Sequence, residues 1–110
     1  MPDPSTVSAV LIVRNEARNL EACLSSLRWA DEIVVLDSGS TDGTREIARR
    51  FTPHVHDRPF DDFASQKNAA VALSTGDWVL VVDADERIPP ALAEEVRRAS
   101  SAPGAAGYRI

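Results

Sequence analysis

The segment that most constrains the fold is a continuous apolar run at residues 78–82, WVLVV, which ends abruptly at Asp83, Ala84 and Asp85. A run that is apolar throughout, rather than alternating, is typical of a strand buried on both faces of a parallel sheet that helices cover. Asp83 and Asp85 then lie where this strand leaves the sheet. In open α/β sheets, ligands bind beyond the carboxyl ends of the strands.

The two carboxylates after this run predict a site for a divalent cation. In an extended backbone, side chains two residues apart point to the same side, so Asp83 and Asp85 are expected to face the same way. Two carboxylates about 4 Å apart repel by about 4 kcal/mol near a protein surface, and a cation between them removes that repulsion. Mg²⁺ typically takes one or two carboxylates together with substrate phosphates. The alternative is a pair of solvated acids at a strand end.

Patterns typical of strands and helices alternate along the chain. Apolar segments at residues 7–13, 32–36 and 54–57 predict three more strands, and residues 108–110 predict the start of a fifth. The helices expected between them are one that Asn15 caps and that buries Leu20, Cys23, Leu24 and Leu27, one at residues 44–51, one at 63–74, and one that starts at Pro89 and Pro90 and buries Leu92, Val96 and Ala99. This alternation predicts a three-layer α/β/α fold with a mainly parallel sheet.

The length of the chain limits the number of domains. A chain of 110 residues is enough for one small domain with a core. Residues 1–6 are polar and contain proline, so we expect a flexible tail there and a domain at residues 7–110. The fifth expected strand begins only at the end of the chain. We therefore expect a domain truncated at its C-terminal end, with an exposed apolar edge through which the chain self-associates.

Charge and cysteine content exclude some classes of protein. The net charge of −5 argues against nucleic-acid binding, which usually needs a basic surface. Cys23 is the only cysteine, so no internal disulfide can form, as is usual in a reducing compartment. We recognise no signal peptide and no apolar segment long enough to span a bilayer. These features predict a cytoplasmic protein, and peripheral association with the inner face of the membrane stays open.

Polar residues follow three of the expected strands. Residues 14–16 follow the first, Asp37 follows the second, and Asp83 and Asp85 follow the apolar run. In a parallel sheet these ends share one edge, so we expect a single ligand site, although Asp37 also fits a role in its local turn. Neither G-x-G-x-x-G after the first strand nor the P-loop pattern is present, which disfavours those dinucleotide and mononucleotide sites. A nucleotide whose phosphates are held by a metal fits better.

Four segments together resemble a known family. They are VLIVRNE at residues 10–16, VVLDSGSTDGT at 34–44, QKNAA at 66–70 and GDWVLVVDAD at 76–85. In this order and spacing they resemble the family 2 glycosyltransferases, which have the Rossmann-like GT-A fold. ADEI at residues 30–33 and ADER at 84–87 resemble more narrowly a bacterial subgroup that adds glucose to the lipopolysaccharide core.

The resemblance implies roles for the acidic residues. Asp83 and Asp85 match the D-x-D positions that hold Mg²⁺ or Mn²⁺ on the donor diphosphate, and Ala84 between them is expected at the nucleotide. Asp37 matches the acid that hydrogen-bonds the uracil of the donor.

Other expected nucleotide-binding residues come from the same resemblance. Val13, Arg14, Asn15 and Glu16 match the loop that packs around the nucleoside. Lys67 matches a basic position near the nucleotide that is more often arginine in the family. Lysine keeps the charge but lacks the bidentate geometry of a guanidinium.

The implied activity is that of an inverting glycosyltransferase. It would transfer a sugar from a UDP-glucose-like donor to a saccharide or lipid-linked acceptor, in the synthesis of lipopolysaccharide or another cell-envelope polysaccharide. In the family, the catalytic base lies after the fifth strand, so here it is expected beyond Ile110. This chain would then supply the donor and metal site of a longer enzyme.

Two other classes of function remain open on the sequence. The first is a non-catalytic module that binds a nucleotide without turnover. The second is a metal-dependent nucleotidyltransferase or phosphohydrolase that uses the same acid pair. A nucleotidyltransferase of similar fold usually carries a glycine-rich, basic signature after its first strand, which this chain lacks.

Overall fold

The computed structural model describes residues 6–100 and 108–109, and in this part of the chain five strands form one sheet. The strand order is β3-β2-β1-β4-β5, and every pair of neighbours is parallel. The strands are β1 (Val7–Val13), β2 (Glu32–Asp37), β3 (Val55–Asp57), β4 (Trp78–Val81) and β5 (Tyr108–Arg109). The predicted parallel sheet is therefore confirmed.

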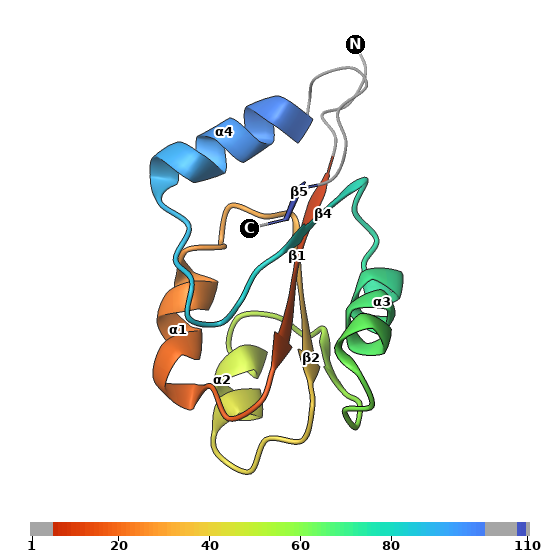
Figure 1. The fold of residues 1–110 in the computed structure, drawn as a ribbon. Helices are drawn as coiled ribbons and strands as arrows, with labels where there is room; N and C mark the ends of the chain where they lie inside the picture. The colour runs from red at the N-terminus through yellow and green to blue at the C-terminus, as the bar shows by residue number, and fades with distance from the viewer. Residues whose placement is uncertain (1–5, 101–107, 110) are drawn as a thin grey trace.

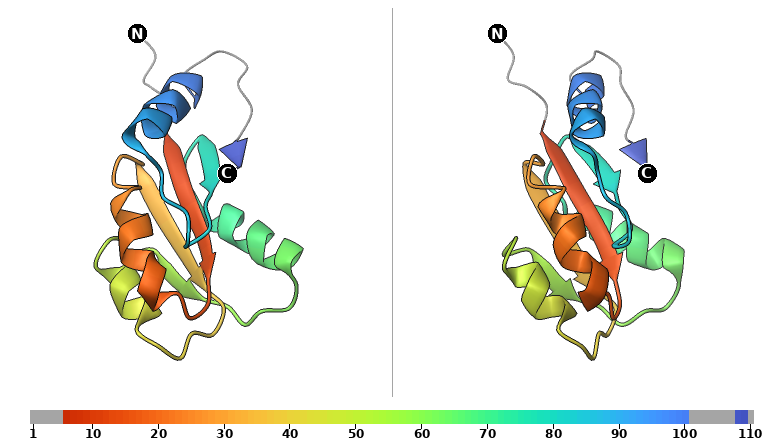
Figure 2. Two further views of the ribbon diagram at one scale, coloured as in Figure 1. Left: turned by 60° about the vertical axis from the view of Figure 1, so that its left-hand side comes forward. Right: turned by 90° about the vertical axis from the view of Figure 1, so that its left-hand side faces the viewer.

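Helices cover both faces of the sheet. Helices α1 (Ala17–Ser25), α2 (Thr44–Arg49) and α4 (Pro90–Ser100) lie on one side, and α3 (Phe63–Leu73) lies on the other (Figures 1 and 2). The larger apolar cluster lies between the sheet and the first group of helices, and the smaller one lies beneath α3. This arrangement confirms the three-layer α/β/α fold.

The predicted buried faces of the helices are largely observed. Leu20, Cys23, Leu24 and Leu27 are all inaccessible to solvent, and burial raises the pKa of the Cys23 thiol to about 11. In α4, Val96 is buried and Leu92 packs against the core. Helix α3 buries Ala70, whose small side chain allows close packing against the strands.

Parts of the expected chain organisation fall outside the described residues. These are positions 1–5 of the expected tail, residues 101–107 before β5, Ile110 and the side chain of Ala99. The backbone N–H and hydroxyl of Thr6 donate to the Asp77 carboxylate, at 3.0 and 3.3 Å. Among the described residues, no helix is long and apolar enough to cross a membrane.

Candidate functional site

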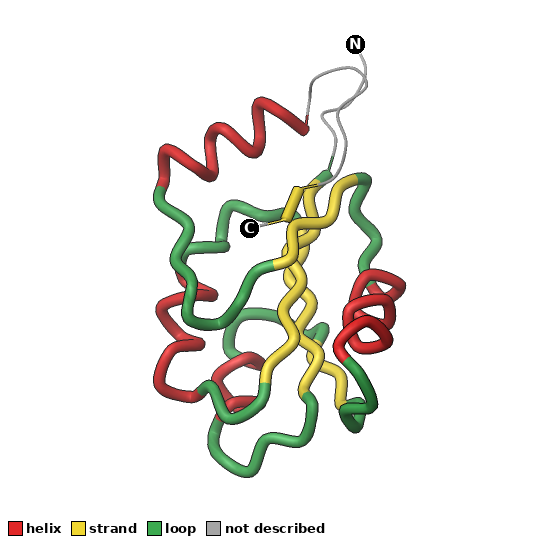
Figure 3. Tube along the Cα trace, in the orientation of Figure 1, coloured by secondary structure: helices red, strands yellow, loops and turns green. Residues whose placement is uncertain are grey.

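The polar strand ends share one edge of the sheet, but the strands end at different levels. Val13 is paired with Asp37, so β1 and β2 end together, whereas Val10 is paired with Val81 at the end of β4. The chain after β4 turns early towards α1, while the loops after β1 and β2 extend further (Figure 3). Because β2 and β4 flank β1, they lie about 10 Å apart. The two acidic sites are thus at the same edge, side by side rather than in contact.

Asp37 is fully buried and organises the turn that follows β2. Its Oδ2 accepts hydrogen bonds from the N–H groups of Gly39 (3.0 Å) and Ser40 (2.8 Å), and its Oδ1 accepts one from the Ser40 hydroxyl (2.5 Å). Gly39 has a φ of +105°, a backbone conformation that residues with a Cβ rarely adopt. An ionised carboxylate can accept about four hydrogen bonds, so Asp37 retains capacity for a ligand donor.

The loop after β1 is held against the loop after β2. The N–H of Asn15 donates to Ser40 Oγ (2.8 Å), and Asn15 Oδ1 accepts from the N–H of Thr41 (2.8 Å). The N–H of Glu16 donates to Thr44 Oγ1 (2.9 Å). Side chains of the second loop therefore set the conformation of residues that were predicted to pack around a nucleoside.

The prediction that Asn15 caps α1 is wrong. The helix begins at Ala17, the N-cap position is Glu16, and Asn15 has a left-handed φ of 53°. Asparagine tolerates this conformation better than most residues, and its side chain is engaged with the neighbouring loop instead. The first N–H of the helix, from Ala17, donates to Asp42 Oδ2 at 3.3 Å.

A cavity of about 360 Å³ lies where β1, β2 and β3 end. It is lined by Arg14 after β1, residues 37–39 after β2, residues 57–60 after β3, and Arg45 of α2. Arg45 lies 3.6 Å from Asp37 and 3.2 Å from the exposed Asp57. The cavity therefore combines one buried carboxylate with three arginines, which suits a ligand that carries both hydrogen-bond donors and acceptors.

The acids after β4 lie in a turn, and the predicted extended backbone is wrong. The N–H of Glu86 donates to the Asp83 carbonyl (2.9 Å), and the Glu86 carboxylate accepts from the N–H of Asp83 (2.8 Å). These two reciprocal hydrogen bonds close the turn, and Ala84 within it is 5% exposed and packs into the core. Asp83 and Asp85 remain exposed on either side of this turn.

The carboxylates at this turn provide only some of the ligands that a hard cation such as Mg²⁺ needs. The described residues contain no group of three or more His, Cys, Asp or Glu side chains arranged for a metal. Asp83 and Asp85 could supply one or two carboxylate ligands, which is the number that Mg²⁺ commonly takes when substrate phosphates complete its shell. Neither residue lines the cavity beside Asp37 within the described part of the chain.

Gln66 and Arg58 were not among the site residues expected from the sequence. Gln66 is completely buried, and its amide bonds both Ser38 and Arg58, which line the cavity. Gln66 belongs to the QKNAA segment that resembles the family, but only Lys67 of that segment was expected to bind the nucleotide. Lys67 is half-buried on α3 and is absent from the described lining of the cavity.

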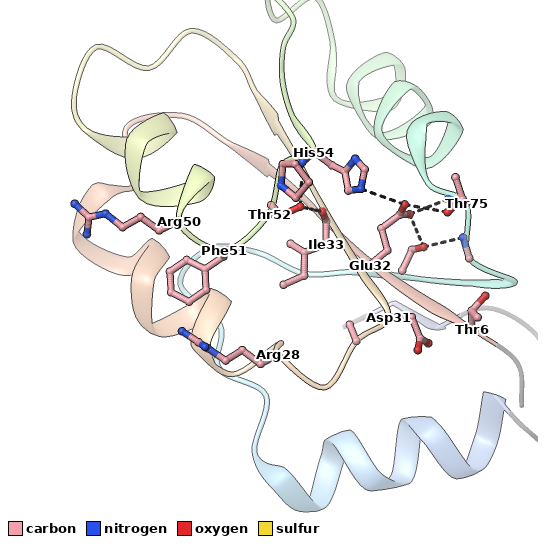
Figure 4. Close-up of a pocket in the computed structure, with 14 residues that line it drawn as sticks. Thr6, Arg28, Asp31, Glu32, Ile33, Arg50, Phe51, Thr52, His54 and Thr75 are labelled. Carbon is pink, nitrogen blue, oxygen red and sulfur yellow. Dashed lines mark hydrogen bonds and ion pairs between the residues drawn. The ribbon is translucent and has the colours of Figure 1, made fainter.

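A second cavity, of about 670 Å³, lies at the opposite, amino edge of the sheet (Figure 4). Its central group is Glu32, which accepts hydrogen bonds from the Ser8 hydroxyl (2.8 Å) and from the N–H (2.8 Å) and hydroxyl (2.9 Å) of Thr75. Burial would raise the pKa of Glu32, but the hydrogen bonds from Thr75 and Ser8 lower it overall. This network joins β1, β2 and the turn before β4, so its evident role is structural.

Known proteins with similar sequences or structures include glycosyltransferases and sugar-phosphoglycerate synthases. The family model "Glycosyl transferase family 2" matches residues 8–108. The lipopolysaccharide core biosynthesis glycosyltransferase LpsC of Rhizobium meliloti is 37% identical over 93 residues, which are 80% of this chain and 34% of LpsC.

Solved structures agree with the family match. Mannosyl-3-phosphoglycerate synthase from Rubrobacter xylanophilus superposes with a TM-score of 0.75 and 28% identity over 91% of this chain and 37% of that protein. Glucosyl-3-phosphoglycerate synthase from Mycobacterium tuberculosis, in complex with Mn²⁺, UDP and glucosyl-3-phosphoglycerate, gives 0.65 and 27% over 76% of this chain and 36% of that protein. The chain thus spans about a third of these proteins, and it belongs to glycosyl transferase family 2.

Proposed function

We propose that this chain is the donor-binding part of a glycosyltransferase that uses a UDP-sugar and an acceptor hydroxyl, in the synthesis of lipopolysaccharide or another cell-envelope polysaccharide. The observation that carries the proposal is the shared edge of the sheet, where the Asp37 cavity and the Asp83–Asp85 turn lie side by side. The UDP complex of the Mycobacterium tuberculosis synthase supports the donor class. The name of the Rhizobium meliloti relative supports the pathway.

The residues would divide the donor between two positions. The nucleoside would occupy the cavity, where Asp37 Oδ1 can accept one more hydrogen bond and Arg14 contributes a positive charge. The diphosphate would extend across the end of β1 to the β4 turn, where Asp83 and Asp85 would hold Mg²⁺ or Mn²⁺. When bound, the metal supplies positive charge that stabilises the leaving diphosphate. The catalytic base would lie beyond Ile110.

The acceptor side of the proposal concerns parts of the relatives that these 110 positions do not span. The chain spans only 34% of LpsC, so the residues that bind a saccharide or lipid-linked acceptor would lie outside these 110 positions. A lipid-linked acceptor would place the enzyme at the cytoplasmic face of the membrane.

Calorimetric titration of the chain with UDP tests this proposal. We expect Mn²⁺ to strengthen UDP binding, and the Asp83→Ala, Asp85→Ala double variant to lose that dependence, because the metal would lose its protein ligands. The Glu94→Ala, Glu95→Ala variant removes the same charge from the exposed face of α4 and serves as the control. Affinity that ignores Mn²⁺, or that survives loss of both aspartates, would contradict the proposed site.

A further inference from the structure

Gln66 occupies an unusual position for a polar side chain. It lies on α3, is 0% exposed and uses every hydrogen-bonding group of its amide. Its Nε2 donates to Ser38 Oγ (2.8 Å) and to the Arg58 carbonyl (3.0 Å), and its Oε1 accepts from Arg58 Nη1. Burial of an amide is costly unless its groups are bonded, so this fully bonded side chain ties α3 to the ends of β2 and β3.

Arg58 is held by these bonds at the mouth of the cavity. Besides Gln66, its guanidinium contacts the Asp61 carboxylate at 3.3 Å from Nη1 and 3.5 Å from Nη2. These bonds use three of the five N–H groups of a guanidinium, which leaves two without a partner among the described residues. The side chain is 35% exposed and lines the cavity, so these donors are accessible to a ligand.

The position of Arg58 indicates which part of a nucleotide it would meet. Arg58 follows β3, which lies on the far side of β2 from β4 and its two aspartates. A diphosphate held at the β4 turn therefore leaves the base at the β3 end of the cavity. Phe60, which is 51% exposed, lines the same end and presents an aromatic face of the kind on which bases stack.

We propose that Arg58 is a residue that determines base specificity and that Gln66 is a positioning residue that holds it. This inference rests on the proposed function. A guanidinium offers only donors, so it matches a base edge that carries a carbonyl oxygen, as uracil and guanine do. Cytosine and adenine present an amino group at the corresponding position, which opposes the donors of Arg58. The site therefore prefers UDP over CDP.

The structure favours Arg58 over Lys67 for this role. Lys67 follows Gln66 in the sequence, whereas Arg58 is hydrogen-bonded to the Gln66 side chain. Lys67 is absent from the described lining of the cavity, whereas Arg58 is part of it. Replacement of each cation by glutamine therefore separates the two assignments.

The test is the ratio of UDP to CDP affinity, measured by calorimetry with Mn²⁺ on the chain and its variants. We expect Arg58→Gln to reduce the ratio by at least about fivefold, the lower bound for one discriminating contact to a base. Lys67→Gln and the surface control Arg98→Gln should leave it unchanged. An unchanged ratio in Arg58→Gln, or a reduced ratio in Lys67→Gln alone, overturns the inference.

Variants of Gln66 test the positioning role through the same ratio. Gln66→Met has a similar size but no acceptor for the guanidinium, so the ratio should fall as in Arg58→Gln. Gln66→Glu keeps an acceptor for the guanidinium but loses both donors of Nε2, so it should preserve the UDP preference while lowering stability, which a purely structural role would not predict. If the Met variant does not fold, Arg58→Gln still decides the specificity claim. Failure of the wild-type chain to bind UDP would instead overturn the proposed function itself.

Discussion

Replacement of Asp37 separates its structural role from its proposed ligand role. In Asp37→Ala, three donors lose their acceptor: the N–H groups of Gly39 and Ser40 and the Ser40 hydroxyl. Gly39 is exposed, so its N–H can bond to water, but Ser40 is only 4% exposed. In Asp37→Asn, the amide oxygen can still accept from both N–H groups, and its nitrogen can donate to Ser40 Oγ.

The expected costs follow from these contacts. A buried donor without a partner costs about 1–3 kcal/mol, and Asp37→Ala leaves two in Ser40. We therefore expect Asp37→Ala to lower the free energy of unfolding by about 4 kcal/mol, which is a large part of the roughly 5–15 kcal/mol that stabilises a typical domain. Asp37→Asn keeps the bonds from both N–H groups but reverses the bond with the Ser40 hydroxyl and loses the charge on the acceptor, so its cost should be about 1–2 kcal/mol.

Urea unfolding monitored by circular dichroism measures these costs, and UDP titration of the folded variants measures the ligand role. Asp57→Ala is the matched control, because it removes an exposed carboxylate from the same cavity and should cost several-fold less than Asp37→Ala. Equal stability of wild type and Asp37→Ala, or equal losses in the Ala and Asn variants, would refute the reasoning. Asp37→Asn should bind UDP more weakly, because the ligand loses a charged acceptor.

Two further predictions concern stability. In Gly76→Ala the new Cβ would meet Ser8 Oγ and lie 2.8 Å from Ser8 N, so thermal unfolding should show a loss of about 1–3 kcal/mol. Gly43, the N-cap residue of α2, has no neighbour within 4 Å of an added Cβ, so Gly43→Ala should lose less, through the weaker N-cap preference of alanine. Equal melting temperatures of the two variants would contradict this. The hydrogen bond from Arg97 lowers the pKa of Asp31 below its unfolded value, so its stabilisation is present above that value and lost as the pH falls through the folded pKa. Urea unfolding measured between about pH 5 and about pH 2 should show that Asp31→Asn loses less stability on acidification than wild type does.

Much of the fold could be predicted because burial leaves a direct pattern in the sequence. The first strand was predicted at residues 7–13 and is observed as Val7–Val13, since six of its seven residues are buried. The strands predicted at 32–36 and 78–82 are observed as Glu32–Asp37 and Trp78–Val81. Their ends differ by one residue because hydrogen-bond pairing, and not hydrophobicity, decides where a strand stops.

The candidate site was less predictable because loop contacts are not periodic. Asn15 fits a helix cap by residue type, yet its side chain bonds Thr41, 26 positions away in the sequence. The carbonyl of Asp83 in the turn after β4 accepts a hydrogen bond from the thiol of Cys23 in α1, 60 positions away. Residues that lie this far apart in the sequence come together only when the sheet has formed.

The sequence by itself determined the layered α/β fold and the shared edge of its polar strand ends, because apolar runs must be buried and parallel strands end on the same side. Tertiary structure alone decided how that edge is built: it turned the Asp83 segment around a buried alanine and brought Gln66 of α3 to Arg58 after β3. The physical reason is that hydrophobic burial acts on the local pattern of residues. Hydrogen bonds between loops depend on distances that exist only in the folded chain.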